Sequence, residues 1–303
     1  MANITIKVTD EKIEEMKFFY QDFFQEVNNP YIVFSAKVEG CVVNLYTSKK
    51  CTFQGENAEE EASIWTEEEE NISQLVNDEW KVKTNHIGSD EVGTGDFFGP
   101  IVVCACYVEE NDIPWLTKLG VTDSKKLSDE KIKEIAKELI NKLTFSCLVC
   151  DNLTYNKQIE KGLNMNSIKA ILHNRALLNV INKRKLISPV IIVDQFAEEN
   201  LYYNYLKNTK DPIVNNITFK TKGETYAPAI ACASIIARYR FLEKMEELNS
   251  IYKLGEIPKG ASQLVDIFGQ LFVKKYGFDK LQEIAKMNFK NVEKILNPLN
   301  KLL

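Results

Sequence analysis

One short acidic segment divides the chain into two parts with different residue patterns, and this division constrains the fold more than any other feature. Residues 56–79 contain ten acidic residues and no lysine or arginine, and Glu67–Glu70 is an uninterrupted acidic run. We interpret the run as a solvated linker, and an electrostatic mimic of nucleic acid is the alternative. We therefore expect an N-terminal domain at residues 1–66, an acidic linker at 67–83 and a second domain at 84–303.

Outside this acidic segment, the numbers of basic and acidic residues are nearly equal. The whole chain has a net charge of −5, yet residues 84–303 contain 30 basic and 26 acidic residues. A mildly basic second part permits an anionic partner without requiring one. The seven cysteines are odd in number and scattered, which favours reduced thiols over a disulfide framework. No apolar run approaches the ~18 residues of a membrane span, and the N-terminus has no apolar signal core, so we expect a soluble cytoplasmic protein.

The first part of the chain has the pattern of a small α+β domain. Alternating residues predict its first strand, and Thr9 or Asp10 can cap the helix that follows. Glu39-Gly40 is a hairpin turn signal between two further strands. We expect the helices on one face of the sheet, which leaves the other face free. The predicted strands cover residues 3–8, 31–37, 41–47 and 50–54, and a short second helix covers 58–66.

After residue 84 the pattern changes to strands that alternate with helices, which predicts an α/β domain. Ser128 is positioned to cap a helix with a clear apolar stripe, and Pro228 to open a long Ala-rich helix. The predicted strands are 86–90, 100–108, 144–150 and 189–194, and the later helices are 165–183, 228–249, 261–276 and 279–296.

The densest chemical signal is GSDEVGTGDFFGP at residues 88–100. Asp90 and Glu91 follow a short apolar strand, where neighbouring side chains point to opposite faces, so they can converge on one metal only if the chain bends. Gly93 supplies that freedom. The string is not the dinucleotide fingerprint, because Phe98 stands at the third glycine position, and the chain contains no Walker A motif.

Two further carboxylates are candidates for the same site. Asp194 ends the apolar strand VIIVD, and ligands of open α/β sheets bind at the carboxyl ends of strands; a helix cap is the alternative. Glu243 lies on the helix that begins at Pro228, and an exposed helix acid is its alternative interpretation. Together with Asp90 and Glu91 they form a set that hard divalent cations such as Mg²⁺ prefer.

The histidines and cysteines give weaker evidence for a catalytic or metal-binding site than the carboxylates do. His86 and His173 are the only histidines, and we interpret both as structural, which leaves little for a Ser-His-Asp or Cys-His mechanism. Cys147 and Cys150 form a lone CxxC inside an apolar strand, with no second pair at zinc spacing, so we expect core packing.

Four strings in this order closely resemble the type 2 / type 3 ribonuclease H family: DEVGTGDFFGP, DSKKL, VIIVD and ASIIARYRFLEKM. Thr94 between two glycines, the apparent fourth acid Glu243 and the additional N-terminal domain favour the ribonuclease HIII branch. The resemblance implies a ribonuclease H-like mixed sheet flanked by helices. It also implies an N-terminal domain that resembles the TATA-binding-protein fold and holds the substrate, with Lys37, Lys49 and Lys50 as candidate phosphate contacts.

The resemblance also assigns roles to residues of this chain. Asp90, Glu91 and Asp194 would bind the metal, Mg²⁺ or Mn²⁺, and Glu243 would complete the catalytic set. The turn Gly93, Thr94 and Gly95 would contact the RNA 2′-hydroxyl, and Lys125 of DSKKL would contact a phosphate, although DSK can equally be a plain helix-entry loop.

The implied activity is endonucleolytic hydrolysis of the RNA strand of RNA–DNA hybrids, giving 5′-phosphate and 3′-hydroxyl ends. Two alternatives stay open at this point: a non-catalytic nucleic-acid-binding protein, and an HII-like enzyme that incises at single embedded ribonucleotides. We expect a monomer, because no surface pattern indicates pairing. We also expect no binding to membranes.

Overall fold

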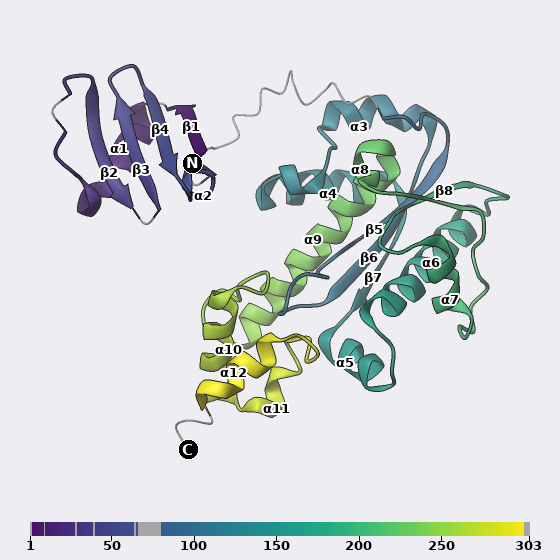
Figure 1. Cartoon of the computed structure of the whole chain (residues 1–303). Helices are drawn as coiled ribbons and strands as arrows, with labels where there is room; N and C mark the ends of the chain where they lie inside the picture. Colours follow the sequence, from purple (N-terminus) through teal and green to yellow (C-terminus); the bar gives the residue numbers. More distant parts are fainter. Residues whose placement is uncertain are drawn as a thin grey trace. The chain divides into compact units, whose positions relative to one another are not determined.

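The computed structural model of the chain describes residues 2–8, 10–27, 29–38, 40–63, 65 and 80–299. The chain divides into two compact units, Met1–Gln74 and Leu75–Leu303 (Figure 1). The predicted acidic run Glu67–Glu70 lies outside the described residues.

The smaller unit is a four-stranded antiparallel sheet in the order β1-β4-β3-β2. Both helices pack on one face, where Met16 of α1 and Ala62 of α2 join a core with Val43 and Phe53. The strands match the predicted ones to within about a residue, whereas Phe23 and Phe24 are exposed beyond the end of α1. The elements are β1 (Ala2–Lys7), α1 (Asp10–Tyr20), η1 (Gln21–Phe23), β2 (Ile32–Val38), β3 (Cys41–Tyr46), β4 (Lys50–Gly55) and α2 (Ala58–Ser63).

The opposite face of this sheet is polar. In the register of the strands, Thr5 pairs with Thr52 and Asn44 pairs with the same Thr52, so these three side chains form a row across the middle of the sheet. The face without helices is therefore suited to contact a polar partner. The resemblance to the TATA-binding-protein fold stays a prediction.

The larger unit is built on a five-stranded mixed sheet in the order β7-β6-β5-β8-β9. The first three strands are antiparallel neighbours, whereas β8 is parallel to both β5 and β9. This confirms the predicted α/β mixed sheet and adds β9, which the sequence pattern did not reveal. The strands are β5 (His86–Val92), β6 (Ile101–Val108), β7 (Thr144–Cys150), β8 (Val190–Asp194) and β9 (Ile217–Lys220).

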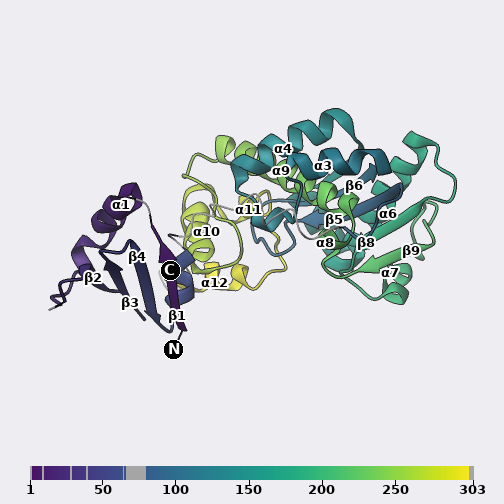
Figure 2. The same ribbon diagram turned by 90° about the horizontal axis from the view of Figure 1, so that it is seen from above.

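Helices cover both faces of the mixed sheet, so its strands are apolar on both sides. Along β6, Val102 and Cys104 face the core beneath α3, α4 and α9, whereas Ile101 and Val103 face the core beneath α6 and α7. Figure 2 shows α3, α4 and α9 on one side of the strands and α7 on the other. The helices of this layer are α3 (Ile113–Leu119), α4 (Asp129–Lys142), α5 (Asn152–Glu160), α6 (Met165–Arg184), α7 (Glu199–Leu206), α8 (Gly223–Tyr226) and α9 (Pro228–Ile251).

The C-terminal region differs from the prediction. The expected helix at 279–296 is broken into α11 (Phe278–Leu281) and α12 (Asn291–Leu299), which follow α10 (Gln263–Tyr276). The residues between them use their backbone groups elsewhere: the Gly99 amide donates to the Ile284 carbonyl, and the Lys286 amide donates to the Phe97 carbonyl. These bonds to a distant loop replace the hydrogen bonds that would have continued the helix.

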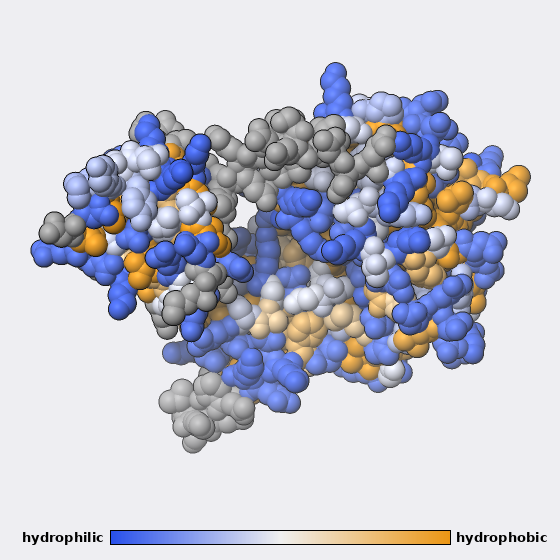
Figure 3. All heavy atoms as spheres, turned by 45° about the horizontal axis from the view of Figure 1, so that its top comes forward, coloured by the Kyte–Doolittle hydropathy of each residue, from blue (hydrophilic) through white to orange (hydrophobic). Residues whose placement is uncertain are grey.

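The hydropathy of the surface and the state of the cysteines are consistent with the expectations from composition. Figure 3 shows mostly hydrophilic residues over the larger unit, with hydrophobic residues in small patches. Within the described ranges, no helix has the length and apolar character needed to span a membrane. All seven cysteines are free thiols, and six of them are buried, including Cys150 of the CxxC pair.

Candidate functional site

A pocket of about 430 Å³ opens at the carboxyl ends of β5 and β8. This is the edge of an α/β sheet at which ligands bind most often. Its lining combines acidic, glycine and basic residues: Asp90, Glu91, Val92, Gly93, Thr94, Gly95, Asp96, Asp123, Ser124, Lys125, Asp194, Glu224, Ser234, Arg238, Phe241, Leu242 and Lys259.

Asp90 lies on the face of β5 that packs against α9 and is only 8% exposed. Its Oδ1 accepts a hydrogen bond from the Glu91 amide at 2.7 Å, and the Ser234 side chain bonds the same carboxyl group. Burial raises the pKa of Asp90 well above its usual value, and the negative charges of Glu91 and Asp194 raise it further. Asp90 therefore lies in a region of concentrated and uncompensated negative charge.

Glu91 points to the opposite face of β5, toward α6, as strand alternation requires. Lys169 Nζ donates to Glu91 Oε1 at 2.8 Å, and His173 Nε2 lies 2.8 Å from Glu91 Oε2. Burial alone would raise the pKa of Glu91, but the hydrogen bonds and charges of His173 and Lys169 lower it to about 2. The chain itself thus neutralises this acid.

His173 has a second partner and a stacking contact. Its Nδ1 lies 2.5 Å from Ser89 Oγ, and its ring stacks on Phe196 with a centroid distance of 5.1 Å. Phe196 also lies under Lys169, whose Nζ is 4.2 Å from the ring centroid. The interpretation of His173 as merely structural missed its bond to Glu91. The spacing of Lys169 and His173, four residues apart on one helix face, was the available signal.

Asp194 ends β8 and lines the pocket from the neighbouring strand. Its Oδ1 accepts a hydrogen bond from the Gly223 amide at 2.8 Å. A Cβ at Gly223 would lie 2.6 Å from Ile230 Cδ1 and 3.1 Å from Asp194 Oδ1, so the start of α8 packs closely against both side chains. Burial raises the pKa of Asp194, and the charges of Glu224 and Glu91 add to this shift.

Glu224 is an acid that the sequence analysis did not identify. It lies on α8, directly after β9, and is buried at 7% exposure in the lining of the same pocket. Trp80 Nε1 donates to its carbonyl at 3.1 Å, which fixes the backbone of this short helix. The available signal was an acid just beyond the carboxyl end of a strand, but the four residues of β9 were too few to predict that strand.

Glu243 is not brought to the other acids, which corrects the predicted set. On α9, Ser234, Arg238 and Leu242 follow one another at helical spacing and line the pocket. Glu243 lies one residue further, about 100° around the helix, where its Oε2 accepts a bond from Arg240 Nη1 at 2.6 Å. Its side chain is 32% exposed, as expected for a surface helix acid.

The glycine turn and Lys125 also line this pocket, and their predicted contacts with substrate stay a prediction. Gly93 has φ +93°, and a Cβ there would lie 2.2 Å from the Pro100 carbonyl oxygen. At Gly95 a Cβ would meet open space. Lys125 is the middle residue of the one-turn helix Ser124–Lys126. Its amide donates to Asp123 Oδ1 at 2.9 Å, and its charge lowers the pKa of Asp194 against the larger effects that raise it.

The donor set fits a hard divalent cation, because the mutual repulsion of buried carboxylates marks a place where positive charge is missing. Among the residues that the structure describes, no three acids, histidines or cysteines are yet grouped as a complete cation site. Both oxygens of Glu91 face Lys169 and His173. By contrast, Asp90 is bonded by the Glu91 amide and the Ser234 side chain, and Asp194 by the Gly223 amide, so both of these acids have neutral partners.

Comparison with known proteins decides the family. Residues 87–292 match the family model for ribonuclease HII, and residues 3–76 match that of a domain of unknown function, DUF3378. Ribonuclease HIII of Bacillus mycoides is 40% identical over 99% of this chain and 100% of its own length. The chain belongs to the ribonuclease HIII family. Ribonuclease HIII of Listeria monocytogenes is 39% identical, again over 99% of this chain and 100% of its own length.

Solved structures agree with this membership. Bst-RNase HIII in complex with Mn²⁺ superposes with a TM-score of 0.70 at 33% identity, covering 99% of this chain and 100% of that one. RNase H3 of Aquifex aeolicus, at 23% identity and a TM-score of 0.56, shares the fold over 95% of this chain and 100% of its own. The chain is therefore a ribonuclease H enzyme, and the alternative of a non-catalytic binding protein is set aside.

Proposed function

We propose that this member of the ribonuclease HIII family cleaves the RNA strand of RNA–DNA hybrids with Mg²⁺ or Mn²⁺, using Asp90, Glu91, Asp194 and Glu224. The observation that carries the proposal is that these four acids line one pocket together with the turn at Gly93–Gly95 and Lys125. Carboxylates suit hard cations, and Lys125 suits a phosphate. Mn²⁺ in the related Bst-RNase HIII structure supports the choice of metal class.

The residues of the pocket have different roles in the proposed hydrolysis. A divalent ion bound there would stabilise charge on the phosphate and activate a water. Asp90, Asp194 and Glu224 supply negative oxygens on the α9 side, and Lys169 and His173 hold Glu91 on the α6 side. Water attack on phosphorus with departure of the 3′-oxygen gives 5′-phosphate and 3′-hydroxyl ends.

We propose that the glycine turn distinguishes RNA from DNA. The open space at Gly95 lets backbone amides approach a ribose, and the 2′-hydroxyl is the group that differs between the two nucleic acids. Thr94 lies between the two glycines at the pocket wall.

We propose that the N-terminal unit, residues 1–66, holds the hybrid duplex on its polar sheet face, that residues 67–83 act as a linker and that 84–303 form the catalytic domain. Lys37 pairs with Val42 and Lys50 pairs with Lys7, which puts these lysines on the same sheet face as Thr52. Lys49 lies in the adjacent turn. Lysines around a flat polar face suit phosphate backbones.

We further propose that one chain suffices and that it acts in the cytoplasm. The four acids proposed for the site, Asp90, Glu91, Asp194 and Glu224, all come from one chain. Seven free cysteines fit a reducing compartment.

The experiment that tests the proposal compares two duplexes labelled at the ribonucleotide strand: a continuous RNA–DNA hybrid and a DNA duplex with one embedded ribonucleotide. We expect cleavage of the hybrid with Mg²⁺ or Mn²⁺, no cleavage with chelator, and slower incision of the second duplex. Preferred incision at the single ribonucleotide would favour the HII-like alternative. If neither duplex is cleaved, the proposal is refuted.

A further inference from the structure

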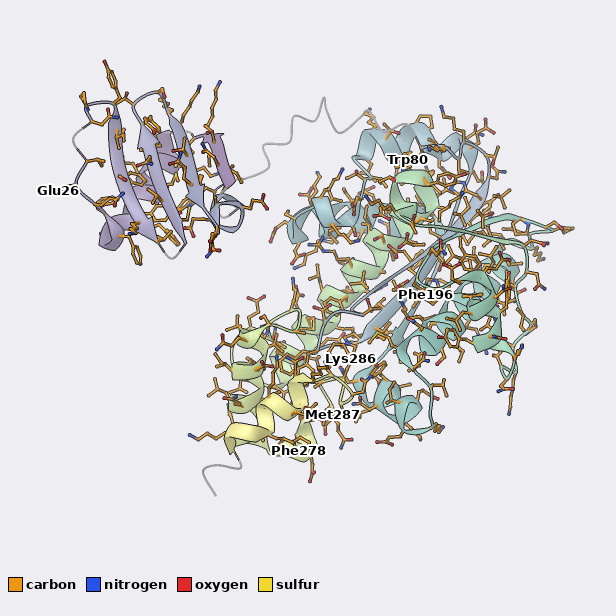
Figure 4. The ribbon with its side chains drawn as sticks, in the orientation of Figure 1. Glu26, Trp80, Phe196, Phe278, Lys286 and Met287 are labelled. Carbon is orange, nitrogen blue, oxygen red and sulfur yellow. The ribbon has the colours of Figure 1, made fainter. Side chains whose placement is uncertain are left out.

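Lys286 is a fully buried lysine in the segment between α11 and α12. Its Nζ donates to two main-chain carbonyl oxygens, those of Asp96 at 2.8 Å and Gly99 at 2.6 Å. Figure 4 shows Lys286 between the C-terminal helices and the ends of the central strands. Its ammonium group therefore bridges a loop of the pocket and the C-terminal helices.

Burying an ammonium group among carbonyls is costly, because both acceptors carry only partial charges. Burial lowers the pKa of Lys286 to about 7, and the nearby negative charge of Asp96 acts in the opposite direction. An apolar side chain of similar length would fill the same space without this cost. The lysine is thus suited to bring the two carbonyls together, which no apolar side chain can do.

The carbonyl of Gly99 is oriented for this bond by its backbone. Gly99 has φ +82°, and a Cβ there would lie 2.5 Å from Met245 Sδ. Asn152 Nδ2 donates to the same carbonyl oxygen at 2.9 Å. Two side chains from different elements therefore converge on one main-chain oxygen.

Further bonds attach the same loop to the C-terminal region. The Phe97 amide donates to the Gly260 carbonyl at 2.8 Å, and the Gly260 amide donates to Asp96 Oδ1 at 2.6 Å. The Lys286 amide donates to the Phe97 carbonyl at 2.9 Å. Residues 96–99 are thus held on two sides by chain segments that lie more than 150 residues away in the sequence.

The loop held in this way is continuous with the glycine turn. Gly93 contacts the Pro100 carbonyl so closely that the two ends of the loop 93–100 meet, and Asp96 directly follows the turn. The position of Gly93–Gly95 is therefore set at one end by β5 and at the other by residues 96–100. A displacement of residues 96–100 would therefore move the turn away from a bound ribose and weaken its contact with the substrate.

We propose that Lys286 is a positioning residue that sets the Gly93–Gly95 turn for the ribose of the substrate, so that the C-terminal helices are part of the substrate-recognition machinery. The inference rests on the proposed function of that turn.

The test uses the full chain with Lys286→Met, which keeps the side-chain length and removes the donor. We expect KM for the RNA–DNA hybrid to rise about 10-fold or more while kcat changes by less than about 3-fold. We also expect faster deuterium exchange in the peptide that contains Thr94 and Gly95, and unchanged exchange in the smaller unit.

The matched control is Asn174→Leu, which removes a buried side chain that likewise bridges main-chain groups: Asn174 bonds the Pro212 carbonyl and the Val214 amide. It should lower thermal stability without changing KM or the exchange of the turn. Equal KM values for Lys286→Met and wild type, or equal KM increases in both variants at equal loss of stability, would overturn the inference. Failure of the wild-type chain to cleave the hybrid would instead refute the proposed function.

Discussion

The two neighbouring acids at the end of β5 have opposite electrostatic surroundings. On the α9 side, burial and the charges of Glu91 and Asp194 raise the pKa of Asp90. On the α6 side, Lys169 and His173 lower the pKa of Glu91 despite its burial. Strand alternation alone sends the two side chains to these different faces. The difference teaches that the chain neutralises Glu91 by itself but gives Asp90 no such partner, and this asymmetry supports the proposed cation site on the α9 side.

The largest effect is expected from removing the charge on the α9 side. Asp90→Asn should lower single-turnover cleavage by roughly 10³-fold or more, because the variant keeps the shape but loses a negative oxygen. Hybrid affinity, measured without turnover, should change little. Near wild-type cleavage by this variant would remove Asp90 from the site.

The same substitution, Asp90→Asn, should stabilise the fold although it lowers cleavage. Without divalent ions, Asp90→Asn should raise the free energy of unfolding by roughly 1 kcal/mol, because a buried carboxyl group surrounded by negative charge is replaced by a neutral amide. Urea unfolding in chelator measures this. A loss of stability would contradict the description of this side as uncompensated.

The next comparison separates the acid in the pocket from the acid outside it. Glu224→Gln should lower kcat by roughly 100-fold. Glu243→Gln should leave kcat within about twofold of wild type, because Glu243 is paired with Arg240 on the helix surface. Steady-state cleavage of one hybrid by both variants checks this. The reverse order of effects would restore Glu243 to the catalytic set.

The α6 side can be tested through stability. Lys169→Met should lower the free energy of unfolding by roughly 3 kcal/mol, because it leaves a buried carboxylate with one partner fewer. Lys183→Met is the matched control on the same helix, where the side chain is exposed and its Nζ donates to the Phe145 carbonyl and lies over the Phe145 ring. That control should change stability by less than about 0.5 kcal/mol. Equal effects of both variants would show that Lys169 does not neutralise Glu91.

The pH dependence of stability tests the same pairing of Lys169 with Glu91. The pKa of Glu91 falls from its ordinary 4.5 to about 2, so its contribution to stability is complete above about pH 4.5 and is lost as the pH falls toward 2. The stability of Lys169→Met should therefore fall less steeply over this range than that of wild type. Parallel curves would contradict the pairing.

The smallest effect is expected in the N-terminal unit. Lys37→Ala combined with Lys50→Ala should raise KM about threefold and make binding less dependent on salt, with kcat unchanged. Lys17→Ala is the control, because Lys17 lies on α1, on the other side of the sheet, and bonds Glu14. A larger effect of the control than of the pair would contradict substrate binding by the polar sheet face.

The sequence predicted the parts of this structure that depend on local pattern. The strand that ends at Asp194 is a continuous apolar run, Asp90 follows a shorter stretch with a strand pattern, and Pro228 marks the start of α9, so their positions followed from the local pattern. Both acids could be placed at the same sheet edge because parallel strands end there.

The parts that could not be predicted depend on long-range contacts. Glu224 follows a strand of only four residues, too short to be recognised without its neighbour β8. The bond of His173 to Glu91 joins residues 82 positions apart. Glu243 was assigned from the resemblance, whereas the orientation of α9 against the sheet decides which stripe of the helix faces the pocket.

The most direct test of the central claim is Mn²⁺ binding measured by the loss of the free-ion electron paramagnetic resonance signal. The account predicts that the wild-type chain binds Mn²⁺ in the absence of nucleic acid and that Asp90→Asn weakens this binding by about 10-fold or more. Equal Mn²⁺ affinity of the two chains would contradict it, since the cation would then be held elsewhere than at the acids of the α9 side.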